Sequence, residues 1–253
     1  MQVVILAGGL GTRLAEETDV TPKPMVRIGE DPILIHIMRH FAKYDHRDFV
    51  IAGGYKYSVI ADYFKEYSDS HNQLTDGSTL VVSCEGYKSQ PWTIKVVDTG
   101  QSTATGGRIL RLKNLLSSRF FLTYGDGLSN VNLYDLELFA ARFNKIATVT
   151  AVHPPARFGT LTFKGDFVSE FSEKSPQSVG WINGGFFLLK KEICDYIKDP
   201  EQVIFERNPL EKLTQESQLV GFKHEGFWHP MDTLRDKKDL EILWQSGNAP
   251  WLR

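Results

Sequence analysis

The first eleven residues constrain the fold of this chain more than any other stretch. A short apolar run from Val3 to Leu6 predicts a buried strand, and it leads directly into Gly8, Gly9 and Gly11. Glycines at the end of a strand let backbone N–H groups approach a ligand with no Cβ in the way, and several of these donors can converge on one anion. The sequence therefore predicts a sharp turn after the first strand that can hold an anion.

Two basic residues follow this loop. Arg13 adds a planar charged side chain shortly after Gly11, and Lys23 stands between Pro22 and Pro24. Because proline fixes φ and restricts the residue before it, we expect Lys23 to lie on a stiff, non-helical segment. Backbone N–H groups together with two cations suit a ligand that carries several phosphates, such as a nucleoside triphosphate.

The two common glycine-loop patterns do not fit this stretch. Walker A requires Gly-Lys-Ser/Thr at its end, and none follows Gly11, while the dinucleotide pattern requires a third glycine at position 14, which is Leu14. Taken alone, Gly-Gly-x-Gly is as compatible with a tight turn as with a binding loop. Other motifs in the chain must therefore decide between these two interpretations.

Composition and charge restrict the class of protein. With 253 residues, of which 42% are hydrophobic and 24% charged, the chain can bury the core of one large α/β domain. Its net charge of −2 indicates no basic surface for nucleic acid, and Cys84 and Cys194 lie far apart without metal-ligand spacing. There is no signal peptide pattern and no apolar run of about 18 residues, so we expect a cytoplasmic protein with no membrane contact.

Hydrophobic periodicity predicts strands that alternate with helices through the first 150 residues. The expected strands are 3–6, 48–52, 81–86, 93–100, 119–124 and 147–152, and the expected helices are 33–44, 58–67, 109–116 and 136–143. From His153 onward the pattern changes, and short strands at 160–163 and 167–171 indicate a mixed or antiparallel region packed beside the first half. A strand over 181–191 and helices over 209–215 and 234–244 complete the chain.

Two further places in this pattern are candidate binding sites. Thr103 and Arg108 flank the predicted start of a helix, which is either an ordinary helix turn or a place that holds phosphate or ribose. Gly125 and Asp126 directly follow a buried strand. An acidic residue at the carboxyl end of a parallel strand is well placed for a divalent cation, although an aspartate in a simple turn would look the same.

The ordered set of motifs resembles the sugar-phosphate nucleotidyltransferases. These motifs are LAGGLGTRL followed by KPMV, then VVDTG, TGGR, YGDG, RFGTL, INGGFF and FWHPMDTLRDK. The resemblance covers nearly the whole chain and implies one domain over 1–253, with a nucleotide-binding half at 1–150 and a sugar-phosphate-binding half at 151–253. The implied fold is a Rossmann-like three-layer α/β/α sandwich with a mostly parallel mixed sheet and a small β appendage on the sugar side.

The same resemblance implies roles for individual residues. The implied nucleotide-binding residues are Leu6, Ala7, Gly8, Gly9, Leu10, Gly11, Thr12, Arg13, Lys23, Thr103, Arg108 and Gly125. The implied catalytic residues are Arg13, Lys23, Asp126 and Asp232, the last two as ligands of Mg2+, and the implied acceptor-binding residues are Gly159, Glu173, Lys174 and Asn183. Asp232 could alternatively cap the last helix, and Glu173 with Lys174 could be a solvated charge pair.

Within the family, the motifs are most similar to the branch that uses CTP and α-D-glucose 1-phosphate. The implied reaction gives CDP-glucose and pyrophosphate by magnesium-assisted in-line attack of the sugar phosphate on the α-phosphate, in a protein expected to be a homo-oligomer. One departure concerns the acceptor, since Ser175 stands where the family motif has proline after Glu173 and Lys174. A different phosphorylated acceptor, or a nucleotide-binding relative without turnover, therefore remains an alternative.

Overall fold

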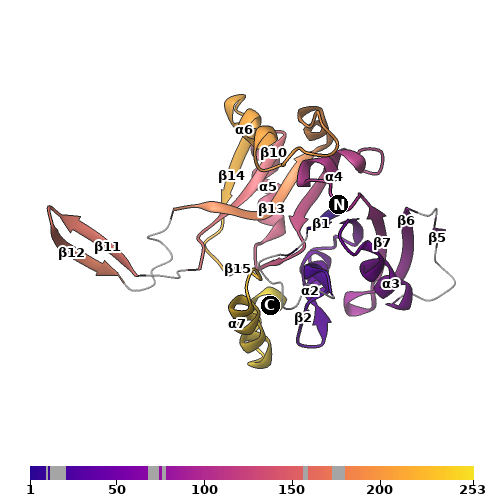
Figure 1. The fold of residues 1–253 in the computed structure, drawn as a ribbon, viewed down its shortest axis with the longest axis horizontal. Helices are drawn as coiled ribbons and strands as arrows, with labels where there is room; N and C mark the ends of the chain where they lie inside the picture. Colours follow the sequence, from indigo (N-terminus) through magenta and orange to yellow (C-terminus); the bar gives the residue numbers. More distant parts are fainter. Residues whose placement is uncertain (10, 12–20, 68–73, 76–77, 156–158, 173–179) are drawn as a thin grey trace.

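A nine-stranded sheet forms the centre of the computed structural model, which describes residues 1–9, 11, 21–67, 74–75, 78–155, 159–172 and 180–253 (Figure 1). In spatial order the strands are β14 (Leu219–Lys223), β10 (Ala147–Val152), β13 (Ile182–Lys190), β8 (Arg119–Tyr124), β1 (Gln2–Ala7), β4 (Asp48–Gly53), β7 (Pro91–Asp98), β6 (Thr79–Glu85) and β5 (Leu74–Thr75). Only β13 and β6 run against the direction that the other described strands share. The predicted fold class, a mostly parallel mixed sheet, is confirmed.

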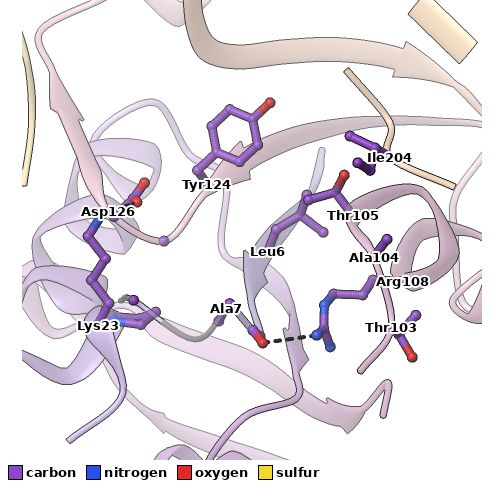
Figure 2. Close-up of a pocket in the computed structure, with 15 residues that line it drawn as sticks. Leu6, Ala7, Lys23, Thr103, Ala104, Thr105, Arg108, Tyr124, Asp126 and Ile204 are labelled. Atoms are coloured by element: carbon purple, nitrogen blue, oxygen red, sulfur yellow. Dashed lines mark hydrogen bonds and ion pairs between the residues drawn. The ribbon is translucent and has the colours of Figure 1, made fainter. Parts of the chain in front are cut away.

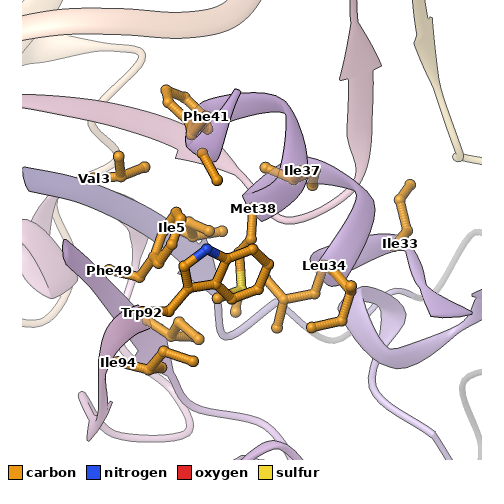
Figure 3. Packing of buried hydrophobic residues seen from close by; sticks show 14 of the residues in the cluster. Val3, Ile5, Ile33, Leu34, Ile37, Met38, Phe41, Phe49, Trp92 and Ile94 are labelled. Atoms are coloured by element: carbon orange, nitrogen blue, oxygen red, sulfur yellow. The ribbon is translucent and has the colours of Figure 1, made fainter. Parts of the chain in front are cut away.

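Helices cover both faces of this sheet and give the three layers. They are α2 (Ile33–Ala42), α3 (Tyr57–Tyr67), α4 (Thr105–Arg111), α5 (Leu133–Phe143), α6 (Asn208–Gln215) and α7 (Leu234–Gln245). Alternate residues of β1 point to opposite faces. Val3 and Ile5 belong to one buried cluster with α2 and its Phe41 (Figure 3), whereas Val4 and Leu6 belong to a second cluster with α4 and α6.

Short elements connect the layers around the ends of β1 and β8. A 3-10 helix, η2 (Lys23–Met25), follows Pro22, and two small antiparallel pairs join β2 (Arg27–Ile28) to β3 (Asp31–Pro32) and β9 (Gly127–Ser129) to β15 (Trp228–Pro230). Three more 3-10 turns are η4 (Tyr87–Ser89), η6 (Lys191–Tyr196) and η7 (Pro250–Leu252). The β9–β15 pair brings the segment before α7 beside the end of β8.

The prediction of a non-helical Lys23 is wrong, because Lys23 begins η2. The reason is that proline is well suited to the first turn of a helix: its missing N–H has no partner there in any case. Pro22 precedes η2 in an extended conformation, with φ −62° and ψ 145°, and Pro24 lies inside the turn. The segment between the two prolines is therefore a turn of helix.

The second half contains a hairpin of β11 (Thr160–Lys164) and β12 (Phe167–Ser172) that pair only with each other. Figure 1 shows it standing away from the nine-stranded sheet. The expectation of an antiparallel pair is confirmed, but its packing beside the first half is wrong. The apolar side chains of the hairpin lie exposed instead, with Phe167 82% and Phe171 65% accessible.

The remaining predicted helices and strands are present, with ends that differ by a few residues. The sequence did not predict β2, β3, β5, β9 or β15, which are two or three residues long, nor the edge strand β14. Of these, β9 and β15 depend on each other across about 100 residues of chain. None of the helices in the described residues is long and apolar enough to cross a membrane.

Candidate active site

A cavity of about 470 Å³ opens where β1 and β8 end side by side (Figure 2). Its lining residues are Leu6, Ala7, Gly8, Gly9, Gly11, Lys23, Pro24, Thr103, Ala104, Thr105, Arg108, Tyr124, Gly125, Asp126 and Ile204. Ligand sites in open α/β sheets lie outside the carboxyl ends of parallel strands, and this cavity has that position. Its size is in the range of cavities that hold small molecules.

The cavity collects most of the residues that the sequence assigned to the nucleotide. Those that line it are Leu6, Ala7, Gly8, Gly9, Gly11, Lys23, Thr103, Arg108 and Gly125, together with the predicted metal ligand Asp126. Leu10, Thr12 and Arg13 lie outside the described residues. The roles of all these residues stay predictions, but all the described ones line a single cavity.

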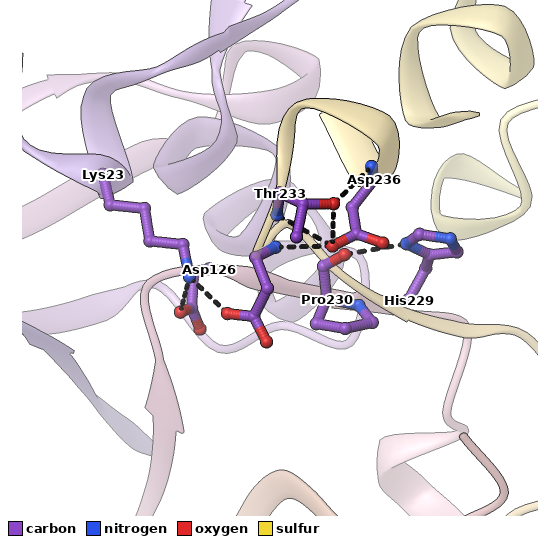
Figure 4. Close-up of polar contacts among 7 residues, drawn as sticks. Lys23, Asp126, His229, Pro230, Thr233 and Asp236 are labelled. Carbon is purple, nitrogen blue, oxygen red and sulfur yellow. Dashed lines mark hydrogen bonds and ion pairs between the residues drawn. The ribbon is translucent and has the colours of Figure 1, made fainter. Parts of the chain in front are cut away.

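A lysine between two carboxylates lies at one end of this cavity (Figure 4). The Nζ atom of Lys23 is 2.7 Å from Oδ2 of Asp126 and 2.6 Å from Oδ1 of Asp232. Burial lowers the pKa of Lys23, but the two carboxylates outweigh burial, so its pKa is raised above the usual value of 10.5. Lys23 is therefore an ammonium ion that both aspartates hold.

Main-chain pairing and a helix cap position the two aspartates. The N–H of Met231 donates to the carbonyl of Asp126 at 2.8 Å, which continues the β9–β15 pair. Thr233, rather than Asp232, caps α7, in a capping box with Asp236. Oδ2 of Asp236 also accepts from the N–H of Asp232 at 3.1 Å (Figure 4). The alternative that Asp232 is only the helix cap is therefore wrong, and its carboxylate points to Lys23.

The aspartate pair suits a magnesium ion by its chemistry. Two carboxylates converge on one cation, the Lys23 ammonium, and both supply the oxygen ligands that Mg2+ prefers. Within the described residues no group of three or more His, Cys, Asp or Glu could hold a metal by itself. Mg2+ is usually bound by one or two carboxylates, with phosphate oxygens and water completing its shell, so the pair fits an ion that arrives with a nucleotide.

Arg108 is bound to the protein itself rather than directed into the open cavity. Its Nη1 donates to the carbonyls of Gly53 (2.9 Å) and Gly100 (2.8 Å) and to Oγ1 of Thr99 (2.7 Å). Its Nη2 donates to the carbonyl of Gly8 at 2.9 Å, and a side chain at Gly8 would collide with the guanidinium. These contacts indicate that Arg108 holds the backbone of the glycine loop in place. A contact between Arg108 and the nucleotide stays a prediction.

The predicted acceptor residues are only partly described. Nδ2 of Asn183 donates to the hydroxyl of Tyr124 at 3.1 Å, which connects this residue to the cavity wall. Gly159 precedes β11 directly, whereas Glu173 and Lys174 lie outside the described residues. The contact of Lys174 with the acceptor phosphate and that of Glu173 with the acceptor hydroxyls remain predictions.

Sequence reasoning missed several residues of the site. Tyr124 and Ile204 line the cavity, and Glu206 stands behind it, bonded to Tyr124 and to Thr105. Tyr124 could have been found, since it is the last residue of β8 and therefore lies at the carboxyl edge of the sheet. Glu206 carries no such signal, because its partners are distant in sequence.

Comparisons with known proteins agree with this geometry. The chain matches the Nucleotidyl transferase family over residues 2–236. It is 44% identical to glucose-1-phosphate cytidylyltransferase of Salmonella typhimurium, over 99% of this chain and 98% of that protein. It is 40% identical, over 99% of both chains, to a Bacillus subtilis protein named "Probable glucose-1-phosphate cytidylyltransferase".

Solved structures share the fold. The crystal structure of HddC from Yersinia pseudotuberculosis superimposes with a TM-score of 0.71 at 24% identity, covering 96% of this chain and 99% of that one. A UDP-glucose pyrophosphorylase complexed with UDP-glucose gives a TM-score of 0.69 at 13% identity, covering 97% and 98%. With a family match over nearly its whole length and the sheet edge, glycine loop and aspartate pair in place, the chain belongs to the nucleotidyl transferase family.

Proposed function

We propose that this protein transfers CMP from CTP to α-D-glucose 1-phosphate and releases CDP-glucose and pyrophosphate. The names of the relatives at 44% and 40% identity support the choice of both substrates. One observation carries the proposal: Lys23 and its two carboxylate partners, Asp126 and Asp232, lie at the cavity that the glycine loop lines. A triphosphate needs both features: N–H donors for its oxygens, and cations where charge builds up in the reaction.

The chemistry requires positioning and charge compensation more than a protein base. The phosphate monoester of the acceptor is already anionic at neutral pH, so its oxygen can attack the α-phosphorus in line once repulsion between the anions is offset. One P–O bond forms to the sugar phosphate, and the P–O bond to the departing pyrophosphate breaks. No proton has to be removed from the nucleophile in this step.

We assign the binding tasks as follows. The loop at Gly8, Gly9 and Gly11 offers N–H groups to the triphosphate, supported from behind by Arg108. Lys23 neutralises charge at the α-phosphate. Asp126 and Asp232 would hold Mg2+, whose charge would offset that of the α-phosphate and the leaving pyrophosphate.

Base selectivity is proposed to come from the segment 98–108 at the other end of the cavity. A site that hydrogen-bonds the exocyclic amine and ring nitrogen of cytosine leaves buried groups unpaired when another base enters. CTP should therefore be used with a higher kcat/KM than UTP or dTTP. Equal values for the three nucleotides would refute the choice of CTP and leave the family assignment unaffected.

The deciding experiment supplies CTP, Mg2+ and a panel of acceptors to the purified protein. Pyrophosphate release and the nucleotide product are measured for glucose 1-phosphate, other hexose 1-phosphates and phosphorylated acceptors without a sugar. CDP-glucose as the best product is expected. A different best product would transfer the proposal to that acceptor, and absence of turnover with every acceptor, despite CTP binding, would indicate a binding protein.

Two further properties complete the proposal. Both substrates carry several charges and do not cross an apolar bilayer unaided, so the enzyme must share their compartment, which we place in the cytoplasm.

We also expect a homo-oligomer, and the apolar side chains exposed on the β11–β12 hairpin support this expectation. A test of the assembly is given in the Discussion.

A further inference from the structure

A carboxylate behind the cavity binds one hydroxyl from each of two walls. Oε2 of Glu206 accepts from Oγ1 of Thr105 at 2.7 Å, and Oε1 accepts from the hydroxyl of Tyr124 at 2.5 Å. Thr105 begins α4 and Tyr124 ends β8, and both line the cavity (Figure 2), whereas Glu206 does not. Glu206 therefore lies outside the predicted ligand contacts but touches two residues that can make them.

The direction of each hydrogen bond in this group is determined. An ionised carboxylate only accepts, and a hydroxyl has a single proton. The hydroxyls of Thr105 and Tyr124 therefore both donate their hydrogen bond to Glu206. Each hydroxyl oxygen in turn accepts an N–H: Thr105 from the backbone of Phe205 at 2.9 Å, and Tyr124 from Nδ2 of Asn183 at 3.1 Å.

The chain of bonds ends at Asn183, and it fixes which way the amide points. Nδ2 of Asn183 donates to Tyr124, while Oδ1 accepts from the N–H of Gly185 at 2.9 Å. A reversed amide would bring two donors together at Gly185 and two oxygens together at Tyr124. One N–H and one lone pair of the exposed Asn183 side chain are then left, in fixed directions, for a ligand.

The backbone around Asn183 is held as tightly as its side chain. Gly185 has φ +83°, and a Cβ there would lie 2.6 Å from Cδ2 of Tyr124. The carbonyl of Gly184 accepts from Nε1 of Trp228 at 2.7 Å. The backbone that carries Asn183 is therefore fixed, and the bonds to Gly185 and Tyr124 together orient its amide.

We infer that Glu206 is a positioning residue, which acts through Tyr124 to orient the Asn183 amide and so determines which acceptor sugar hydroxyls the enzyme accepts. The inference rests on the proposed function and adds a source of acceptor selectivity to it. Since a polyol is recognised by donors and acceptors in set directions, a freely rotating amide would accept epimeric sugars almost equally. Thr105, on the other wall, belongs to the same network without lying on the path to Asn183.

The test separates the two substrates. Tyr124→Phe keeps the ring but removes the hydroxyl that joins Glu206 to Asn183, so KM for glucose 1-phosphate should rise at least about fivefold, the size of one misdirected hydrogen bond. KM for CTP should change by less than about twofold. The preference for glucose 1-phosphate over galactose 1-phosphate, as a ratio of kcat/KM values, should fall towards one. Glu206→Ala should reproduce this pattern, because it removes the oxygen that accepts from Tyr124.

Two controls distinguish positioning from general damage. Tyr196→Phe removes a hydroxyl that donates to Glu216 at 2.5 Å on the surface, so it loses an equally short Tyr–Glu bond away from the cavity, and it should leave both KM values unchanged. Thr105→Val removes the other hydroxyl on Glu206 and should spare the acceptor preference. The double variant Tyr124→Phe/Asn183→Ala should match Asn183→Ala alone, since both act on one path.

A second measurement does not depend on turnover. In protein labelled with 15N-asparagine, the Asn183 side-chain signal, assigned by its loss in Asn183→Ala, should move in Tyr124→Phe and Glu206→Ala but not in Tyr196→Phe. An unmoved signal, or KM values for CTP and acceptor that rise together, would overturn the inference. If the wild type makes no CDP-glucose but uses another acceptor, the proposed function fails, and the same comparison with that acceptor and its epimer still decides the role of Glu206.

Discussion

At the scale of single residues, Lys23 and the two aspartates are the group on which the proposed reaction depends most. Asp126→Asn and Asp232→Asn each remove a charge that a divalent cation needs, so turnover should fall by about two orders of magnitude or more. The folded state keeps the neighbouring hydrogen bonds, so the midpoint of urea unfolding should change little. The check is a pair of steady-state assays over a range of Mg2+ concentrations.

The matched control for these variants is Asp239→Asn on α7. Asp239 is exposed and lies 3.9 Å from Arg235, in a surface pair that contributes little to stability. It should keep wild-type turnover. If either Asp126→Asn or Asp232→Asn retains most of its magnesium-dependent activity, that aspartate is not a metal ligand.

Lys23 makes a second prediction possible, because its ammonium lies where both carboxylates point. Lys23→Met removes this cation and leaves two half-buried carboxylates facing each other, which lowers stability in the absence of metal. Added Mg2+ should then raise the Tm of Lys23→Met by several degrees more than that of the wild type. The measurement is thermal unfolding with and without Mg2+, with no nucleotide present.

One result would contradict the prediction for Lys23→Met. An equal rise in Tm for both proteins would mean that Mg2+ binds elsewhere, and Lys95→Met provides the comparison. Lys95 pairs at 3.4 Å with Asp48, the first residue of β4, at the end of that strand away from the cavity. Loss of the Lys95 ammonium should therefore not make the Tm depend on Mg2+.

At the scale of elements, the start of α7 connects helix stability to the site. Thr233→Ala removes the cap that accepts from the N–H of Asp236, which should cost about 1 kcal/mol of unfolding free energy. The capping box also holds the N–H of Asp232, so turnover should fall as well. Asn132→Ala at the cap of α5 is the control, since Asn132 accepts from Tyr134 at 3.0 Å and lies in a different helix. Asn132→Ala should lose a similar free energy of unfolding in urea and keep its turnover. Equal turnover in both variants would mean that the cap of α7 does not affect the position of Asp232.

Most elements of the sheet could be predicted because their signals are local. The runs 119–124 and 147–152 are apolar along most of their length, as expected of strands covered on both faces, and the structure contains both as β8 and β10. Short pairs such as β9 with β15 could not be predicted, since three residues hold no periodicity. Likewise, Asp232 and Thr233 are both good caps in sequence, and only the geometry of Asp236 decides between them.

The residues of the candidate site also fall into two groups, those that the sequence could predict and those that it could not. The glycine loop and Asp126 could be found because each follows a strand in the sequence, and strand ends meet at one edge of the sheet. Glu206 could not, because its hydrogen bonds reach Tyr124 across 82 residues and Thr105 across 101. A contact of that separation depends on the folded arrangement and leaves no pattern in either segment alone.

At the scale of the whole molecule, a buried histidine makes stability depend on pH. His40 packs among the rings of Phe41, Tyr44 and Phe186, and burial lowers its pKa from 6.5 to about 3. Below pH 6.5 the unfolded chain binds a proton that the folded chain does not, so stability falls as pH drops towards 3, by up to about 1.4 kcal/mol per pH unit. His40→Leu should flatten this slope by about that amount in urea unfolding between pH 6 and about 4. An unchanged slope would assign the acid sensitivity to other groups.

The last prediction concerns assembly through the β11–β12 hairpin. Because the register of the hairpin shifts between Thr162 and Phe163, one face carries the apolar residues Leu161, Phe163, Val168 and Phe171, and all four are exposed. A two-stranded hairpin is marginally stable by itself in water, and the proposed reaction needs no other protein, so a second copy with the same apolar face is the expected cover. Light scattering after gel filtration should give a multiple of the 28.7 kDa chain mass, and a smaller species for Phe163→Ser/Phe171→Ser. Ile242→Ser, which removes a 63% exposed side chain from α7, should leave the mass unchanged. A monomeric wild type, or a double variant that assembles normally, would refute this role of the hairpin.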